Sequence, residues 1–432
     1  MKTLSPITCA IVLAGFVFQA VATESVDTES LDVLAQQILS SDASQASSSI
    51  ERLRKAGPAG LDAMFRVYDA RIQKQPATPA IKDPDWERLR TAFDTVAQQR
   101  DAYASHLYWF TNFDEAKAAA RASGKPILSL RLLGKLNEEY SCANSRFFRT
   151  TLYPNAEVSH YLRENFILHW QSVRPVPRIT IDMGDGRRIE RTITGNRIHY
   201  ILDADGNPID ALPGLYGAKT FVAKLQSAFA AEQKLSKLTG RERQLFLGNY
   251  HLLCLNDTLA EWTTSLRQAR SSPGNSSSGD SLGVPEIPFF RRDRLESFTS
   301  DADWQKIAAL HSDDAALDSS SVRLIQSKQP PTAAEAARRA FSKSAVENPM
   351  VRMLRTLQRS IAEDSVRNEY QLHTRIHEWF LQDDVSKNLD ALNSKIYAEL
   401  FLTPNSDAWL GLVPADAYSA LDNGGLVQSK NQ

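Results

Sequence analysis

A short apolar run from Pro126 to Leu132 is the feature that most constrains the fold of this chain. The run lies between segments with helical patterns, and a short apolar segment in that setting is typical of a strand covered on both faces. The segment before it, Asp114 to Ser123, is rich in alanine and is followed by Gly124, a residue type that often ends a helix. The alternation indicates an α/β fold, and we expect residues 126–132 to lie in the middle of a mixed sheet.

The same alternation continues over residues 105–235. Two pairs of strand-like runs are separated by turn sequences, Gly184-Asp185-Gly186 in the first pair and Asp203-Ala204-Asp205-Gly206 in the second, so each pair predicts a β-hairpin. The hairpin strands are expected at 178–183, 188–193, 197–202 and 208–212. The other patterns predict a helix over 143–164, a strand over 166–170 and a closing helix over 220–235.

Composition divides the rest of the chain into helical flanks and one linker. The serine- and glycine-rich stretch at 271–286 buries too little apolar surface to offset the entropy of ordering it, so we interpret it as a flexible linker. Apolar residues at helical spacing fill the other segments. The predicted organisation is an N-terminal helical segment (23–104), an α/β sandwich (105–235), a helical extension (236–270) and a helical C-terminal domain (287–432).

The first 22 residues have the pattern of an export signal. Lys2 precedes an apolar stretch from Ile7 to Phe18, which is too short to cross a bilayer core of about 30 Å as a helix. Ala20-Val21-Ala22 matches the small residues of a cleavage site. We therefore expect export to the periplasm or the extracellular space, with an uncleaved anchor helix as the alternative. No later segment is apolar for long enough to span a membrane.

The charge balance excludes one class of partner. Lys and Arg total 50 and Asp and Glu total 51, so the chain lacks the excess positive charge by which many proteins bind nucleic acid. We expect a protein partner instead, bound through the helical C-terminal domain. The sequence has no phosphate loop and no Rossmann glycine pattern, and no cofactor is predicted.

Several short motifs between 105 and 235 resemble those of a thioredoxin-like domain. Their order and spacing carry the resemblance, which implies a thioredoxin-like sandwich flanked by helices. The motifs are Trp109, Gly124-Lys125-Pro126, Ser141-Cys142-Ala143-Asn144-Ser145, Asn155 to Val158, Ile201 to Gly206, and Gly214. By this resemblance Cys142 is the attacking thiol, Ser145 stands at the position of the second active-site cysteine, and Arg197 or Ile198 stands where the family has a cis-proline that meets an incoming peptide.

Two differences from the family pattern, Ser145 at the second-cysteine position and the absence of a proline at 197–198, determine the functional prediction. A Cys-x-x-Ser site can form a mixed disulfide but cannot resolve it from within the motif, so we predict no general dithiol reductase activity. A helix start favours the thiolate of Cys142, whereas a buried, inert thiol is the alternative. We therefore expect a binding or scaffold module, and the competing hypothesis is a monothiol redox or disulfide-capture protein that uses Cys142. Cys142 and Cys254 are not expected to form a disulfide with each other.

A second constellation lies near the C-terminus. Glu369, His373 and His377 recur at intervals of four residues and therefore share one stripe of a helix. Two imidazoles at this spacing can chelate a divalent ion, with the carboxylate as a third ligand. The alternative is that the stripe is a solvated or hydrogen-bonded helix face that borders a core.

Overall fold

The computed structural model describes residues 28–75, 83–192, 195–271, 291–328, 349–382, 388–404, 406–407, 409–410 and 420–421. The predicted export signal (1–22) and all of the predicted linker (271–286) except Ser271 lie outside these residues. Among the described residues, no helix combines the length and the apolar character that a membrane span requires.

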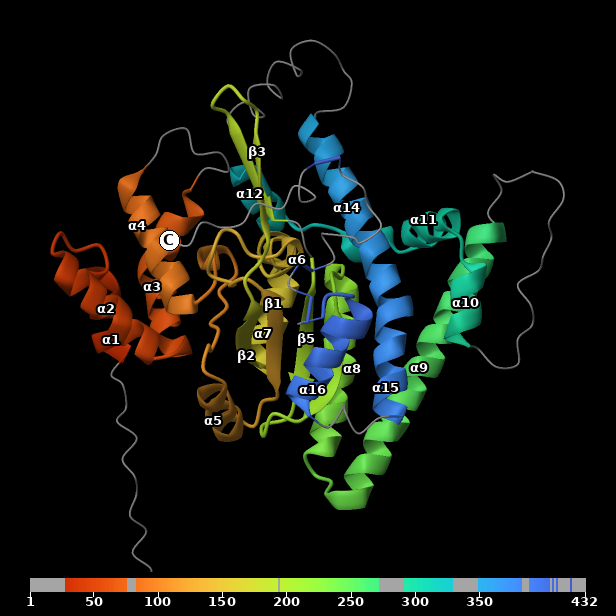
Figure 1. Cartoon of the computed structure of the whole chain (residues 1–432). Coiled ribbons are helices and arrows are strands. Elements are labelled where there is room, and N and C mark those ends of the chain that lie inside the picture. Colours follow the sequence, from red (N-terminus) through yellow and green to blue (C-terminus); the bar gives the residue numbers. More distant parts are fainter. Residues whose placement is uncertain are drawn as a thin grey trace, which may run out of the picture.

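A four-stranded mixed sheet lies at the centre of the molecule, in the order β2-β1-β5-β6 (Figure 1). Its strands are β1 (Ile127–Leu133), β2 (Ile167–Arg174), β5 (Arg197–Leu202) and β6 (Pro208–Pro213). β1 runs parallel to β2 and antiparallel to β5, which forms a hairpin with β6. Every residue of β1 is buried, so the prediction of a covered strand in the middle of a mixed sheet is confirmed.

Helices cover both faces of this sheet. The helices of the α/β segment are α5 (Phe113–Ser123), α6 (Ala143–Phe147), the π-helical turn η2 (Phe148–Leu152), α7 (Ala156–Asn165) and α8 (Ala218–Leu235). On one face, η2 and α8 bring Phe148 and Phe221 against His199 of β5. On the other face, the Tyr200 hydroxyl donates to Asn393 of α16 (Leu389–Lys395) over 3.1 Å. The π-helical turn η6 (Ile396–Leu400) follows α16 directly.

The expected helix over 143–164 is broken, so that prediction is wrong in its extent. The chain leaves the helical path at Tyr153, Pro154 and Asn155 and starts again as α7. Asn155 caps the new helix, because its side chain accepts hydrogen bonds from the backbone N–H groups of Glu157 and Val158. Pro154 has no backbone N–H to continue the first helix.

A second hairpin extends away from the central sheet (Figure 1). It consists of β3 (Arg178–Asp182) and β4 (Arg188–Thr192), which form a separate two-stranded sheet. Gly184 and Gly186 in its turn have φ angles of 78° and 91°, a region that favours glycine. The predicted hairpin is therefore present, with its turn at the predicted glycines.

The N-terminal helices have an apolar core of their own. They are α1 (Thr28–Gln37), α2 (Ala43–Lys55), α3 (Pro58–Gln73), α4 (Pro84–Ala97) and the short 3₁₀ turn η1 (Ala102–Ala104). Leu53, Met64, Leu89 and Phe93 are fully buried among them. Gly60 lets α3 approach α2 closely, since a Cβ at this position would lie 2.0 Å from the Leu53 carbonyl oxygen.

The C-terminal helices share one continuous apolar core with the sheet. Trp262, Trp304 and Leu392 belong to the same cluster of buried side chains as Leu130 of β1. These helices are α9 (Gly240–Ser271), α10 (Arg292–Phe298), α11 (Asp301–Leu310), η3 (Ser312–Ala315), α12 (Ser319–Ser327), α14 (Pro349–Arg367), the π-helical turn η4 (Asn368–His373) and α15 (Thr374–Gln382). Because the core is continuous, polar side chains at the contact between sheet and helices are removed from water.

Candidate functional site

Cys142 lies at the start of α6 and is completely buried. Burial raises the pKa of its thiol, which outweighs the opposite effect of the Ser145 backbone N–H and of Arg197. The thiol is therefore neutral, although the helix start alone favours the thiolate. Ser145 is also buried, and its hydroxyl has no hydrogen-bond partner among the described residues.

Arg197 and Ile198, at the expected cis-proline position, belong to β5 and are both fully buried. The guanidinium carbon of Arg197 lies 2.9 Å from the centre of the Phe148 ring. Burial lowers the pKa of Arg197 to about 10. A buried arginine thus occupies the place where the resemblance implies an exposed backbone for an incoming peptide.

Cys254 lies in α9 and is partly exposed. Cys142 and Cys254 are both free thiols, in agreement with the prediction that they form no disulfide with each other. Burial also raises the pKa of Cys254, to about 12. Neither described cysteine therefore has the lowered thiol pKa of a reactive redox site.

A group of polar side chains, all of them buried except the partly exposed Lys224, lies between the sheet and the C-terminal helices. It contains the three stripe residues Glu369, His373 and His377 and adds residues from three other elements. They are Asp210 of β6, Lys224 of α8, and Tyr250, His251 and Thr258 of α9. We refer to these eight residues as the polar cluster.

Glu369 and His373 are the start of a hydrogen-bonded chain that ends on the sheet. The Nδ1 atom of His373 lies 3.0 Å from Glu369, and its Nε2 atom lies 2.9 Å from Asp210. The Lys224 ammonium lies 2.5 Å from Glu369, and the Tyr250 hydroxyl donates to the second oxygen of Asp210 over 2.6 Å. Two carboxylates and two cationic groups therefore alternate along the chain.

The charged groups of this hydrogen-bonded chain stabilise one another. Burial alone would lower the pKa of His373, but the carboxylates of Glu369 and Asp210 raise it to about 9. Burial would raise the pKa of Glu369, but Lys224 and His373 hold it well below its usual value. Asp210 is held low in the same way, mainly by His373. At neutral pH both carboxylates are ionised and His373 is protonated.

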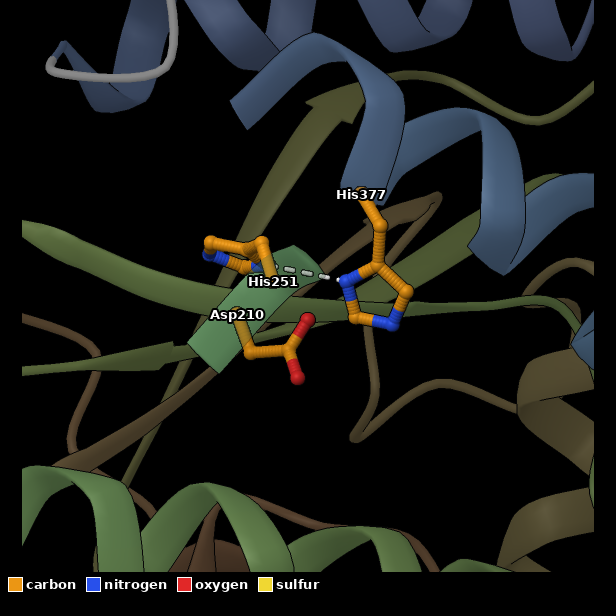
Figure 2. Close-up of side chains that lie close together, drawn as sticks. All are labelled: Asp210, His251 and His377. Carbon is orange, nitrogen blue, oxygen red and sulfur yellow. Dashed lines mark hydrogen bonds between the residues drawn. The ribbon is translucent and has the colours of Figure 1, made fainter. Parts of the chain in front are cut away.

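A pair of histidines lies beside this hydrogen-bonded chain. The Nδ1 atoms of His251 and His377 are 2.8 Å apart, and both rings are buried (Figure 2). Burial lowers the pKa of both, that of His251 to about 4. Figure 2 shows both imidazoles and the Asp210 carboxylate gathered around one point. One ligand atom from each of the three residues lies within 4.8 Å of the others.

A cavity of about 180 Å³ connects the polar cluster with the surface of α9. Its inner wall includes Asp210, His373 and His377, and its outer wall includes Asp257 and Glu261, which are exposed. A small cation or a water molecule thus has a polar route to the cluster.

The stripe Glu369, His373 and His377 could be recognised from its spacing, but Asp210 and His251 were not predicted. Asp210 is a single acid within the apolar strand 208–212, and a lone carboxylate in a buried strand is a signal for a paired charge. His251 has apolar neighbours in α9 and shows no comparable pattern.

A second candidate site is a groove of about 850 Å³ between α6, η2 and α14. Three of its cations have no carboxylate partner among the described residues, and apolar side chains lie between them. The cations are Arg146, Arg191 and Arg352, and the main apolar residues are Phe147, Met353 and Leu357. The groove is therefore both basic and apolar.

The apolar surface of the groove continues onto the hairpin. Ile179, Ile181, Met183 and Ile189 are between 39% and 51% exposed. Ile181 pairs with Ile189 and Ile179 pairs with Arg191, so these side chains share one face. Arg191 also lines the groove, and it joins the two surfaces.

No family model, curated protein or solved structure matches this chain.

Proposed function

We propose that this chain is an exported thioredoxin-like binding module that has no dithiol chemistry. Two observations support the thioredoxin-like assignment. The sheet is mixed and has β1 in its interior, parallel to β2 and antiparallel to β5, which fits the expected mixed sheet with residues 126–132 in its middle. The helices α6 and α7 lie between β1 and β2 in sequence, and α8 follows β6.

The complete burial of Cys142 is the observation that carries the functional proposal. A nucleophilic thiol must be reachable and must ionise, whereas this thiol is inaccessible and its pKa is raised. Ser145 supplies no resolving thiol. Cys142 therefore contributes to packing at the start of α6, and we assign the binding function to the surface around this helix.

The groove and the adjoining hairpin face are the proposed binding surface. Arginines that have no carboxylate partner in the described part of the chain, beside exposed apolar side chains, fit a polypeptide that alternates carboxylates with large apolar residues. The α14 wall of the groove belongs to the helical C-terminal region, through which a protein partner was predicted to bind.

Two assays test this function. Reduction of insulin by dithiothreitol should proceed at the background rate in the presence of the protein. The competing proposal, a monothiol redox protein, requires turnover or a trapped mixed disulfide that is lost in Cys142→Ala, and either result would refute the binding-module assignment.

The binding assay uses fluorescence anisotropy with a labelled peptide of alternating Glu and Leu. A peptide with Gln in place of Glu is the comparison ligand, and Arg352→Glu is the test variant. Arg294→Glu, an exposed change on α10 with the same change in net charge, is the matched control. We expect at least about tenfold weaker binding for the Gln peptide and for Arg352→Glu, which corresponds to about 1.4 kcal/mol. Equal weakening by Arg294→Glu would indicate bulk electrostatics and contradict a specific groove.

A further inference from the structure

We propose that Asp210, His251 and His377 bind a divalent transition-metal ion between the sheet and the C-terminal helices. This inference goes beyond the binding function above and depends on different residues. The three side chains come from β6, α9 and α15, and their ligand atoms lie within 4.8 Å of one another. Two ligands of a tetrahedral Zn²⁺ ion, each about 2.1 Å from the metal, lie about 3.4 Å apart. The 2.8 Å between the two Nδ1 atoms and the 4.8 Å limit for all three ligand atoms lie on either side of this separation.

The two histidines provide the first argument for a metal. Their Nδ1 atoms face each other at 2.8 Å in a site without exposed surface. Two neutral imidazoles in this position satisfy each other only when one donates to the other, and a cation between them accepts a lone pair from each. A ligand set of two imidazoles and one carboxylate favours Zn²⁺, Co²⁺ and Ni²⁺ over Mg²⁺ and Ca²⁺.

The surrounding side chains hold the carboxylate in place. Tyr250 and His373 each contact a different oxygen of Asp210, at 2.6 and 2.9 Å. Glu369 in turn fixes the ring of His373. Such outer contacts are typical of metal sites, because they orient the ligands before the ion binds.

The cavity beside the cluster supplies the other requirements of a metal site. Its volume of about 180 Å³ holds a water molecule as a fourth ligand. Its acidic outer wall, with Asp257 and Glu261, attracts a cation to the entrance. Because the three ligands belong to separate elements, a bound ion stabilises the folded chain, and the stabilisation grows with the logarithm of the free ion concentration above the dissociation constant.

The test uses the untagged, full-length protein, first dialysed against a chelator. Addition of Co²⁺ should give the visible absorption bands of a tetrahedral ion, with an end point of one ion per chain. Zn²⁺ should abolish these bands by competition and should raise the midpoint of thermal unfolding. His251→Gln should lose the bands, whereas His160→Gln, which changes an exposed histidine on α7, should retain them.

A measurement on the wild-type protein keeps the proposal testable if His251→Gln fails to fold. X-ray absorption of the Zn²⁺-loaded protein should show two imidazole ligands, the remaining ligands oxygen, and no sulfur. A sulfur ligand would assign the ion to Cys254, which lines the same cavity, and would refute the proposed ligand set. Absence of the Co²⁺ bands in the wild-type protein, or bands unchanged in folded His251→Gln, would overturn the proposal.

Discussion

Replacement of Glu369 by glutamine tests whether the polar cluster stabilises the contact between the sheet and the C-terminal helices. The Glu369 carboxylate is 5% exposed and is the counter-ion of Lys224 and of His373. It also accepts a hydrogen bond from Thr258 over 3.1 Å. Glutamine keeps the shape of the side chain and removes its charge, so two cationic groups lose the anion between them.

The expected loss follows from these contacts. Removing one partner of a buried ion pair costs about 3–5 kcal/mol, because the other charge stays buried. Lys224 is 26% exposed and regains part of its hydration, so we expect the lower end, about 3 kcal/mol. The native pKa of Glu369 lies below its usual value, so this stabilisation is present above the unfolded-state pKa and is lost as the pH falls. The difference between the two proteins should therefore be largest near pH 7 and shrink in acid.

Urea unfolding at pH 7 and pH 4, followed by circular dichroism in the presence of a chelator, measures this difference. Glu363→Gln is the matched control, since Glu363 pairs with Arg367 over 3.1 Å on α14 with both side chains about one-third exposed. The control should cost less than about 1 kcal/mol. A loss below about 1 kcal/mol for Glu369→Gln at pH 7 would refute the view that the cluster is a stabilising ion-pair chain.

Three other predictions concern different parts of the molecule. Cys142 should resist iodoacetamide in the folded protein and react in urea. Peptide mass spectrometry that finds Cys142 labelled before unfolding would contradict its burial. Cys254, whose thiol pKa is raised to about 12, should react slowly at pH 8. Burial and the neighbouring Asp101 raise the pKa of Asp94 to about 7, so ionisation of Asp94 opposes folding as the pH rises from about 4 to 7. Asp94→Asn should therefore stabilise the protein more at pH 8 than at pH 4. An equal change in the free energy of unfolding at the two pH values would contradict the raised pKa. Gly60→Ala should cost about 2 kcal/mol or more in urea unfolding, whereas Gly248→Ala, with no atom near the added Cβ, should stabilise α9 by about 0.5–1 kcal/mol; similar effects of the two changes would contradict the close approach of α3 to α2.

The central strands could be predicted because their signals are local. The apolar run at 126–132 and the glycines of the two turns specify strands and hairpins without reference to the rest of the chain. The break near Pro154 was missed, although proline followed by asparagine is a local signal for a helix end and a new start. An apolar helical pattern on both sides of Pro154 concealed it.

The candidate site could be predicted only in part, because its residues are far apart in sequence. The interval of four residues made His373 and His377 visible, but their contacts with Asp210 and His251 depend on how the C-terminal helices pack on the sheet. Cys142 illustrates the same limit. A helix start by itself favours a thiolate, and only tertiary packing shows that the thiol is buried and neutral.

The π-helical turn η4 (Asn368–His373) lies inside the helical stretch 349–382, and such a turn contains one residue more than an α-helical turn. Each residue of an α-helix rotates the next by about 100°. Because the wide turn absorbs its extra residue, deletion of a single residue from η4 would restore a regular helix and leave His377 and Trp379 facing α9. The same deletion in a regular α-helical turn between η4 and His377 would rotate both side chains by this angle, away from α9. The structure should thus tolerate the loss of one residue at η4 far better than the loss of one residue from the α-helical turn that follows. It also gives a criterion for comparing genes: a homologue whose helix is one residue shorter at η4 is expected to keep the histidine pair, whereas one that lacks a residue between η4 and His377 is expected to lose it.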